Sequence, residues 1–270
     1  MKKIKFKKIL VLVLWIIVVS GITVTLGFVN AEEKEVKGRS LNITIVNENE
    51  NYFVDEDDIR GFLKDRNDTL LNQPMKDINV YELEKALNAH PAISKAEVSV
   101  DVNGDVKINL KQRKPVVRVF NVQGESYYID TEARFMPLSD NYTAHVLIAN
   151  GFIGEKYSQF YKYTVDDIEK DTLLRRISLL DDIYNISDYV TKDSLLVSLI
   201  QQLYVNTDKE FELYPAVGSH KIIFGDGSNI AEKFDKLKVF YREGLNSINK
   251  WSDYSVINLK YKDQVVCTKK

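Results

Sequence analysis

The sequence is poor in the residues that build most catalytic and metal sites. Its 270 residues include one cysteine and three histidines, which excludes an internal disulfide framework and a cysteine-rich zinc site. Proline (5) and glycine (12) are also scarce, and neither forms a long tract. The remaining composition, with 44% hydrophobic and 28% charged residues, is that of a globular protein. A wholly disordered chain and a wholly membrane-embedded chain are both excluded.

The formal net charge of -2 conceals an uneven distribution. Residues 1–8 hold five lysines and no acidic residue. Removing those five of the 37 basic residues leaves 32 against 39 acidic ones. Because this larger part is mildly acidic, it repels polyanions, and the sequence predicts no nucleic-acid partner.

Residues 9–29, ILVLVLWIIVVSGITVTLGFV, form an uncharged run of 21 residues. A helix of that length spans roughly 30 Å, the thickness of a bilayer core. The run predicts a single transmembrane helix, with the lysine-rich residues 1–8 as a cytoplasmic tail and the bulk of the chain outside. A signal peptide cleaved near Ala31 is the alternative, but the apolar run is longer than a usual signal core.

A first module follows the polar linker at residues 30–40. Residues 41–47 alternate between apolar and polar side chains, as in a strand. Asp55 precedes a cluster of acids and is predicted to cap a helix, which we favour over a metal site. Asn79 is the expected cap of a second helix over residues 80–89, which ends before Pro91.

A β-hairpin is the clearest local signal of this module. Asn103-Gly104 separates two alternating apolar runs, and such a turn requires positive φ at both residues. The apolar positions are Val98, Val100, Val102, Val106, Ile108 and Leu110. The expected order is therefore strand, helix, helix, strand, strand.

This order behind a single N-terminal anchor resembles a POTRA domain, predicted here for residues 41–115. The stretches NVYELEKAL (79–87), HPAI (90–93) and QRKPV (112–116) further resemble the FtsQ/DivIB family of bacterial cell-division proteins. A later segment, SYYIDTEARFMPLS (126–139), resembles another step of that family, with Ala133 where glycine is usual. The resemblance covers about residues 1–268.

The second module, residues 116–270, is predicted to be an FtsQ-type β domain: a mixed sheet with flanking helices. Helical periodicity extends over 165–184 and again from Ile230 to Ile248, and strands are expected at 144–149, 211–215, 221–224 and 254–261. Gly225-Asp226-Gly227 lacks the remainder of a phosphate loop and is predicted to form a turn. The overall prediction is an α+β protein.

No catalytic, cofactor-binding or metal-binding residues are predicted, because no nucleophile, base or ligand cluster has workable spacing. The resemblance implies a non-enzymatic scaffold of the division machinery in the inner membrane at the septum, with the bulk of the chain in the periplasm. Its implied partners are FtsB/FtsL-type proteins and the septal peptidoglycan synthase FtsW–FtsI. An extracytoplasmic hydrolase or transferase and a POTRA-bearing transport accessory are the alternatives.

Two partner-binding surfaces are predicted. The resemblance places one at the C-terminal edge of the sheet, where a partner segment adds as a further strand. In a strand over 254–261, Leu259 and Tyr261 would share a face opposite to Lys260, and Lys260 and Lys262 would attract an acidic partner. Residues expected at this edge are Leu259, Lys260, Tyr261, Lys262, Gln264 and Val266. The second surface, for recruitment, holds Glu82 and Lys85.

Overall fold

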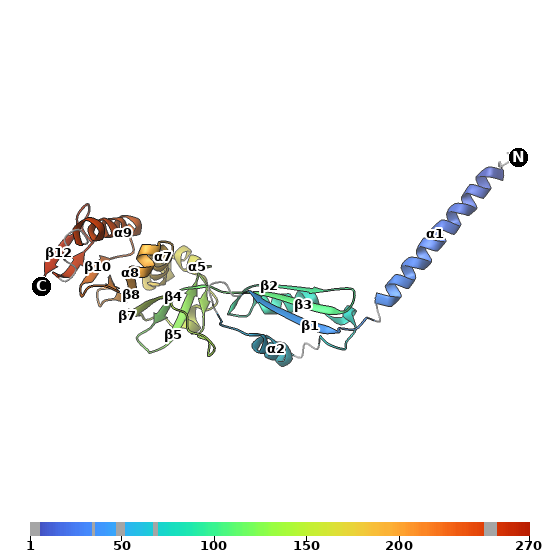
Figure 1. The fold of residues 1–270 in the computed structure, drawn as a ribbon, viewed down its shortest axis with the longest axis horizontal. Helices are drawn as coiled ribbons and strands as arrows, with labels where there is room; N and C mark the ends of the chain where they lie inside the picture. The colour runs from blue at the N-terminus through green and yellow to red at the C-terminus, as the bar shows by residue number, and fades with distance from the viewer. Residues whose placement is uncertain (1–5, 34–35, 47–51, 67–69, 246–252) are drawn as a thin grey trace. The chain divides into compact units, whose positions relative to one another are not determined.

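The computed structural model describes residues 6–33, 36–46, 52–66, 70–245 and 253–270. It is a mixed α+β protein, as expected. The chain divides into two compact units: unit 1 comprises Met1–Val46 and Val54–Lys111, and unit 2 comprises Asn47–Phe53 and Gln112–Lys270. Figure 1 labels the elements.

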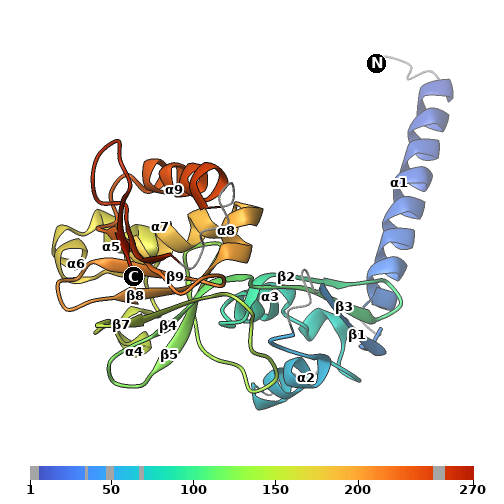
Figure 2. The ribbon, with the colours of Figure 1, turned by 60° about the vertical axis from the view of Figure 1, so that its left-hand side comes forward.

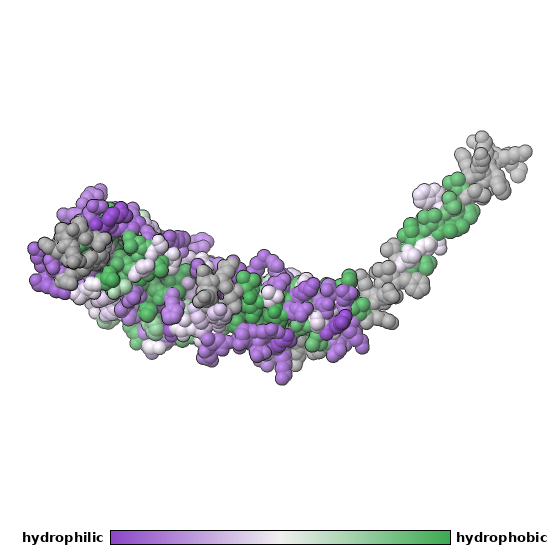
Figure 3. All heavy atoms as spheres, viewed as in Figure 1, coloured by the Kyte–Doolittle hydropathy of each residue, from purple (hydrophilic) through white to green (hydrophobic). Residues whose placement is uncertain are grey.

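Helix α1 (Phe6–Glu33) precedes the first strand. Its side chains are described for residues 11–25, and the large apolar ones among them are exposed, as the hydrophobic colouring of Figure 3 shows. Thr23 and Thr25 turn their hydroxyl groups back to backbone carbonyl oxygens of the preceding turn. Within the described residues, no helix combines the length and apolarity that crossing a bilayer requires. The spanning helix expected over residues 9–29 therefore stays a prediction.

Unit 1 has the predicted order of strand, helix, helix, strand, strand. Its three strands lie in the order β1-β3-β2, with β1 parallel to β3 and Ile43 opposite Ile108. The elements are β1 (Ser40–Val46), α2 (Glu56–Asp65), the 3₁₀ turn η2 (Met75–Asp77), α3 (Val80–Asn88), β2 (Ile93–Val100) and β3 (Asp105–Gln112). Buried aliphatic side chains of α2 and α3 supply its core together with those of the sheet.

Both predicted helix caps of unit 1 are confirmed. Asp55 and Asp58 form a reciprocal capping box, in which each carboxylate accepts the other residue's backbone N–H at 2.9 Å. The Asn79 side chain accepts the N–H of Glu82 at 3.1 Å and starts α3. These caps satisfy backbone donors that the first helical turn leaves unpaired.

The β2–β3 hairpin lies where predicted, but its turn differs. Gly104 has a φ of +90°, whereas Asn103 is not among the described residues with positive φ. The loop runs from Asp101 to Asp105, with a hydrogen bond from Gly104 N–H to the Asp101 carbonyl at 3.0 Å. A type I turn followed by one left-handed residue explains this geometry and leaves Val102 77% exposed at the tip.

Unit 2 is built on a nine-stranded mixed sheet with the order β12-β11-β10-β9-β8-β7-β4-β5-β6. Its N-terminal strands are β4 (Pro115–Phe120), β5 (Ser126–Asp130), β6 (Phe135–Met136) and β7 (Leu147–Gly151). Its C-terminal strands are β8 (Ile200–Val205), β9 (Phe211–Pro215), β10 (Lys221–Gly225), β11 (Tyr254–Asn258) and β12 (Val266–Lys269).

Helices cover one face of this sheet, and Figure 2 shows α7, α8 and α9 on the same side. The helices are α4 (Tyr157–Phe160), α5 (Val165–Lys170), α6 (Thr172–Ile177), α7 (Leu180–Thr191), α8 (Ser194–Leu199) and α9 (Ile230–Val239), which continues as the π-helical turn η3 (Phe240–Leu245). Between helices and sheet lies one continuous apolar cluster that includes Ile186, Leu203, Phe224 and Phe234.

The prediction of one continuous helix over residues 165–184 is wrong, because α5, α6 and the start of α7 divide this range. The Asp171 side chain accepts the N–H groups of Leu173 and Leu174, so it ends α5 and starts α6. Ser178 then separates α6 from α7. Aspartate competes for backbone donors in this way, so a helical apolar period does not guarantee one helix.

Four loops within the described residues share one construction. In each, an Asp or Asn side chain accepts the N–H groups two and four residues further on, and the residue three further on has positive φ. The first residues are Asp101, Asn121, Asp130 and Asn206; the left-handed residues are Gly104, Gly124, Ala133 and Lys209. Ala133 therefore keeps the backbone conformation that a glycine would adopt, with a φ of 60°.

Replacing Lys209 by glycine tests this strain. Lys209 is exposed and has a φ of 62°, where a Cβ is unfavourable. Lys209→Gly should raise the free energy of unfolding by roughly 0.5–1 kcal/mol, after the entropy of glycine is subtracted. Gly124→Ala, at a φ of +85° in open space, should lower it by about 1 kcal/mol. Urea unfolding of both variants measures the effect, and a destabilised Lys209→Gly would contradict it.

Candidate partner-binding edge

The strand predicted over residues 254–261 ends at Asn258 instead. The Asn258 side chain accepts the backbone N–H of Lys260 at 3.0 Å, and the chain turns away before Asp263, which has a φ of 55°. Leu259 is 0% exposed and belongs to the core, whereas Tyr261 is 49% exposed. The expectation that Leu259 and Tyr261 share a face is therefore wrong, because strand alternation no longer applies beyond Asn258.

Lys260 already has a partner within unit 2. Its ammonium group lies 2.5 Å from the Glu210 carboxylate, and its stem passes over Gly225, where a Cβ would come within 2.8 Å of Lys260 Cγ. The hydrogen bond to Glu210 raises the pKa of Lys260 above its usual range. Lys260 thus joins the end of β11 to the β8–β9 hairpin.

β12 is the outermost strand of the nine-stranded sheet. It runs antiparallel to β11, with Cys267 opposite Ile257 and Val266 opposite Asn258. Because Lys270 N–H donates to the Asp253 carbonyl at 3.0 Å, alternation directs both backbone groups of Cys267 and the N–H of Lys269 away from β11. The Lys269 carbonyl accepts a hydrogen bond from Ser255 Oγ of β11 at 3.4 Å. No strand of the described chain pairs with that outer side.

The two sides of β12 differ in character. Val265, just before the strand, and Cys267 pack against the apolar cluster below the helices. Val266 is 42% exposed and, by alternation, lies on the opposite side. Lys262 and Gln264, the other predicted contact residues, are exposed in the connection before β12. A further strand would therefore find apolar neighbours on one side and polar solvent on the other.

The edge strand β2 of unit 1 is closed by side chains. The Asn88 side chain bonds to both backbone groups of Ala96, at 2.9 Å for the N–H and 3.3 Å for the carbonyl. Glu84 accepts the N–H of Val98 at 3.1 Å. Helix α3 thus occupies the positions at which another strand would bond, which is a common protection of sheet edges.

Glu82 and Lys85, predicted for recruitment, lie together on the exposed side of α3. Their charged groups are 3.8 Å apart, and their side chains are 53% and 65% exposed. The neighbouring Tyr81 is also exposed. The structure therefore presents these residues to solvent, in a different unit from β12.

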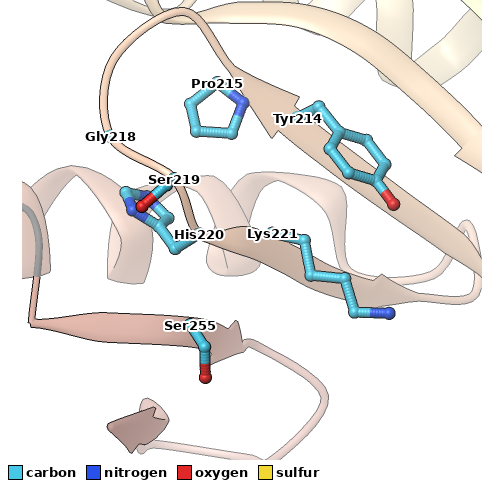
Figure 4. A pocket seen from close by; sticks show the side chains of 7 residues that line it. All are labelled: Tyr214, Pro215, Gly218, Ser219, His220, Lys221 and Ser255. Carbon is cyan, nitrogen blue, oxygen red and sulfur yellow. The ribbon is translucent and has the colours of Figure 1, made fainter. Parts of the chain in front are cut away.

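Unit 2 also contains an open pocket of about 360 Å³ at the start of β10. Figure 4 shows the lining side chains: Tyr214, Pro215, Gly218, Ser219, His220, Lys221 and Ser255. Its polar groups are engaged internally, since Lys221 pairs with Glu212 at 2.9 Å and Ser255 donates to the Thr268 carbonyl at 3.2 Å. Across the described residues, no three His, Cys, Asp or Glu side chains are grouped as metal ligands would be.

Carboxylates gather beside the Gly225-Asp226-Gly227 segment, which forms a turn as predicted. The Asp226 carboxylate accepts a hydrogen bond from the ammonium group of the buried Lys233 at 2.8 Å, and this lowers the pKa of Asp226 to about 2. Asp182 lies so close to Gly227 that a Cβ there would be 1.9 Å from the carboxylate. Burial, then repulsion from Asp181 and Asp226, raises the pKa of Asp182 to about 6.

Sequence reasoning missed Glu210 and Lys233, as well as Lys236 of α9, which donates hydrogen bonds to the connection after β11. Each acts through a contact between residues far apart in the chain or through a loop whose shape only the fold defines. The sequence shows the adjacent acids Asp181 and Asp182, but it does not show that the fold buries Asp181 and partly buries Asp182.

Unit 1 is thus a βααββ unit, and unit 2 is a mixed sheet in which no further strand of the described chain pairs with β12. A family model described as "FtsQ/DivIB, C-terminal related" matches residues 114–268, and one described as a POTRA-like domain matches residues 36–111. No curated protein matches the chain. Since the first match covers more than half of the sequence, the chain belongs to the FtsQ/DivIB family of cell-division proteins, and the resemblance found in its motifs is confirmed.

Protonation of Asp182 gives a testable pH dependence. The pKa of Asp182 is higher in the folded state than in the unfolded state. The folded state is therefore stabilised fully below about pH 4, where Asp182 is protonated, and this stabilisation is lost as the pH rises through about 6. Asp182→Asn should therefore raise the free energy of unfolding by about 1 kcal/mol at pH 7.5, allowing for solvent screening, and by much less at pH 4.5. Denaturant unfolding at both values measures it, with the exposed Asp166→Asn as control. An equal gain at both pH values would contradict the assignment.

Proposed function

We propose that this protein is a non-enzymatic, single-pass scaffold of the division machinery. It links early cytoplasmic division proteins to the late complex of FtsB, FtsL and the septal peptidoglycan synthase FtsW–FtsI. Membership in the FtsQ/DivIB family supports the division role. The observation that carries the binding role is the outer edge of β12, which no strand of the described chain covers, whereas α3 closes the β2 edge of unit 1.

Residues 9–29 serve as the membrane anchor in this proposal. The run is uncharged in sequence, and its described apolar side chains are exposed on α1 rather than packed in a core. The five lysines of residues 1–8 orient the N-terminus toward the cytoplasm. Units 1 and 2 then lie in the periplasm, at the inner membrane of the septum.

A partner segment adds to β12 as a tenth strand of the sheet. Both backbone groups of Cys267 and the N–H of Lys269 form main-chain hydrogen bonds with the partner, which give affinity that does not depend on the partner's sequence. Specificity comes from alternate side chains. One apolar residue of the partner packs beside Cys267 on the helix-covered side, and its neighbours meet Val266 and Thr268 on the other.

Tyr261 is the side-chain anchor of this interface. It is half exposed directly before the connection to β12, and a tyrosine combines a large contact area with a polar tip. Lys262 and Gln264, which follow it in the chain, are polar and exposed. Leu259, which is buried, supports the edge from below and does not contact the partner.

Truncation of Tyr261 separates the interface from the core. Tyr261→Ala should weaken capture of an FtsB-type periplasmic segment about 30-fold, the effect of a hot-spot residue, while the melting temperature stays within a few degrees. Leu259→Ala should instead lower the free energy of unfolding by about 2–4 kcal/mol. Tyr81→Ala, an exposed tyrosine of unit 1, is the matched control and should alter neither quantity. Undiminished capture by Tyr261→Ala would place the interface elsewhere.

Recruitment to midcell is assigned to the exposed face of α3. Exchanging the two charges, with Glu82→Lys and Lys85→Glu, keeps the ion pair but reverses the field that a partner meets. A fluorescent fusion of this variant should lose most of its midcell signal. The control exchanges Lys95 and Glu97, another exposed ion pair of unit 1. Normal localisation of the Glu82/Lys85 variant would remove this surface from the proposal.

A further inference from the structure

Lys236 of helix α9 contacts the connection between β11 and β12 at two points. Lys236 Nζ donates to the backbone carbonyl of Tyr261 at 2.7 Å and to that of Leu259 at 3.2 Å. Its side chain is 15% exposed, and the Glu232 carboxylate lies 3.5 Å away. A single ammonium group therefore satisfies two carbonyl oxygens at the point where the chain leaves β11.

The other contacts of β12 are its pairing with β11, the packing of Cys267 on the core and hydrogen bonds from Ser255 to the carbonyls of Thr268 and Lys269. The strand is four residues long, and within the described chain it pairs with β11 alone. Its side chains Cys267, Thr268 and Lys269 are partly or fully exposed. A short outer strand of this kind is marginally stable by itself, so its position depends on how its connection is held.

Helix α9 gives Lys236 a fixed origin. Phe234 and Leu237, on either side of it in sequence, are completely buried in the core of unit 2. Lys233, one turn earlier, donates to both the backbone carbonyl and the carboxylate of Asp226 at 2.8 Å. The ammonium of Lys236 is thus presented from a rigid element to a connection that has no regular structure.

We infer that Lys236 is a positioning residue for the binding edge. Its two hydrogen bonds hold Leu259–Tyr261 so that Tyr261 faces solvent and β12 lies in register before any partner arrives. Preorganisation of this kind lowers the entropic cost of binding. The inference deepens the proposed function and rests on it for the role of the edge, but the holding of β12 is a property of the protein alone.

Cys267 provides a direct measure of that property. It is the single cysteine of the sequence, lies in β12 and packs partly against the core. Burial raises the pKa of its thiol, which slows its reaction with a thiol reagent while β12 is in place. Release of β12 removes that protection, so the reaction rate reports the position of the strand.

The test uses the full-length chain in mild detergent. Lys236→Met keeps the stem but removes the donor, and Cys267 should react with a disulfide reagent about tenfold faster. Lys236→Arg, which restores donors for both carbonyls, should react at the wild-type rate. Lys192→Met, which removes an exposed lysine paired with Asp188, is the control and should leave the rate unchanged. If Lys236→Met also lowers the melting temperature, Lys236→Gln serves as a second variant. It should accelerate the reaction of Cys267 to the same extent.

Capture of an FtsB-type segment by the same proteins gives the second readout. The dissociation constant should rise about tenfold for Lys236→Met and return for Lys236→Arg. Equal Cys267 rates in wild type and Lys236→Met would overturn the inference whatever the capture result. If the wild type captures no segment while Lys236→Met still exposes Cys267, the proposed function fails and the positioning role stands.

Discussion

Unpaired backbone groups at the outer side of β12 are the constraint on which this account depends. A strand at the end of a sheet leaves every second N–H and C=O group without a neighbouring strand. Unit 1 meets this problem at β2 with side chains, because Asn88 and Glu84 occupy the outward groups of Ala96 and Val98. In unit 2 the outward groups of Cys267 and Lys269 meet no other strand of the described chain. The difference between these edges is what favours a binding role for β12.

Three lysines give the open edge its form. Lys233 fixes the turn before α9, Lys236 holds the chain after β11, and Lys260 extends over Gly225 to Glu210. The side chains of Lys233 and Lys236 are 7% and 15% exposed, so their charge-assisted hydrogen bonds are partly desolvated and stronger than a surface ion pair. Lys260 is 42% exposed, and its ion pair with Glu210 lies nearer the surface. The contact of Lys260 with Glu210 was not foreseen from the sequence, and the prediction that Lys260 attracts an acidic partner stays a prediction.

Local signals predicted much of the fold, and long-range contacts account for most of what they missed. The helix caps at Asp55 and Asn79 could be predicted, because each cap side chain bonds to a backbone N–H only three residues further on. The end of β11 at Asn258 was not predicted, since the apolar alternation continues to Tyr261 and only the turn and the contacts of Lys236 and Lys260 interrupt it. Six edge residues were expected together, yet Leu259 proved to be core.

Addition of a partner strand to the outer side of β12 can be measured directly. Hydrogen exchange of the full-length chain, with and without an FtsB-type periplasmic segment, measures this at the backbone itself. The account predicts that the segment slows exchange of the Cys267 and Lys269 amides, whose N–H groups point outward, and changes β2 little. Unchanged exchange in residues 264–270, with protection acquired on another surface, would contradict it.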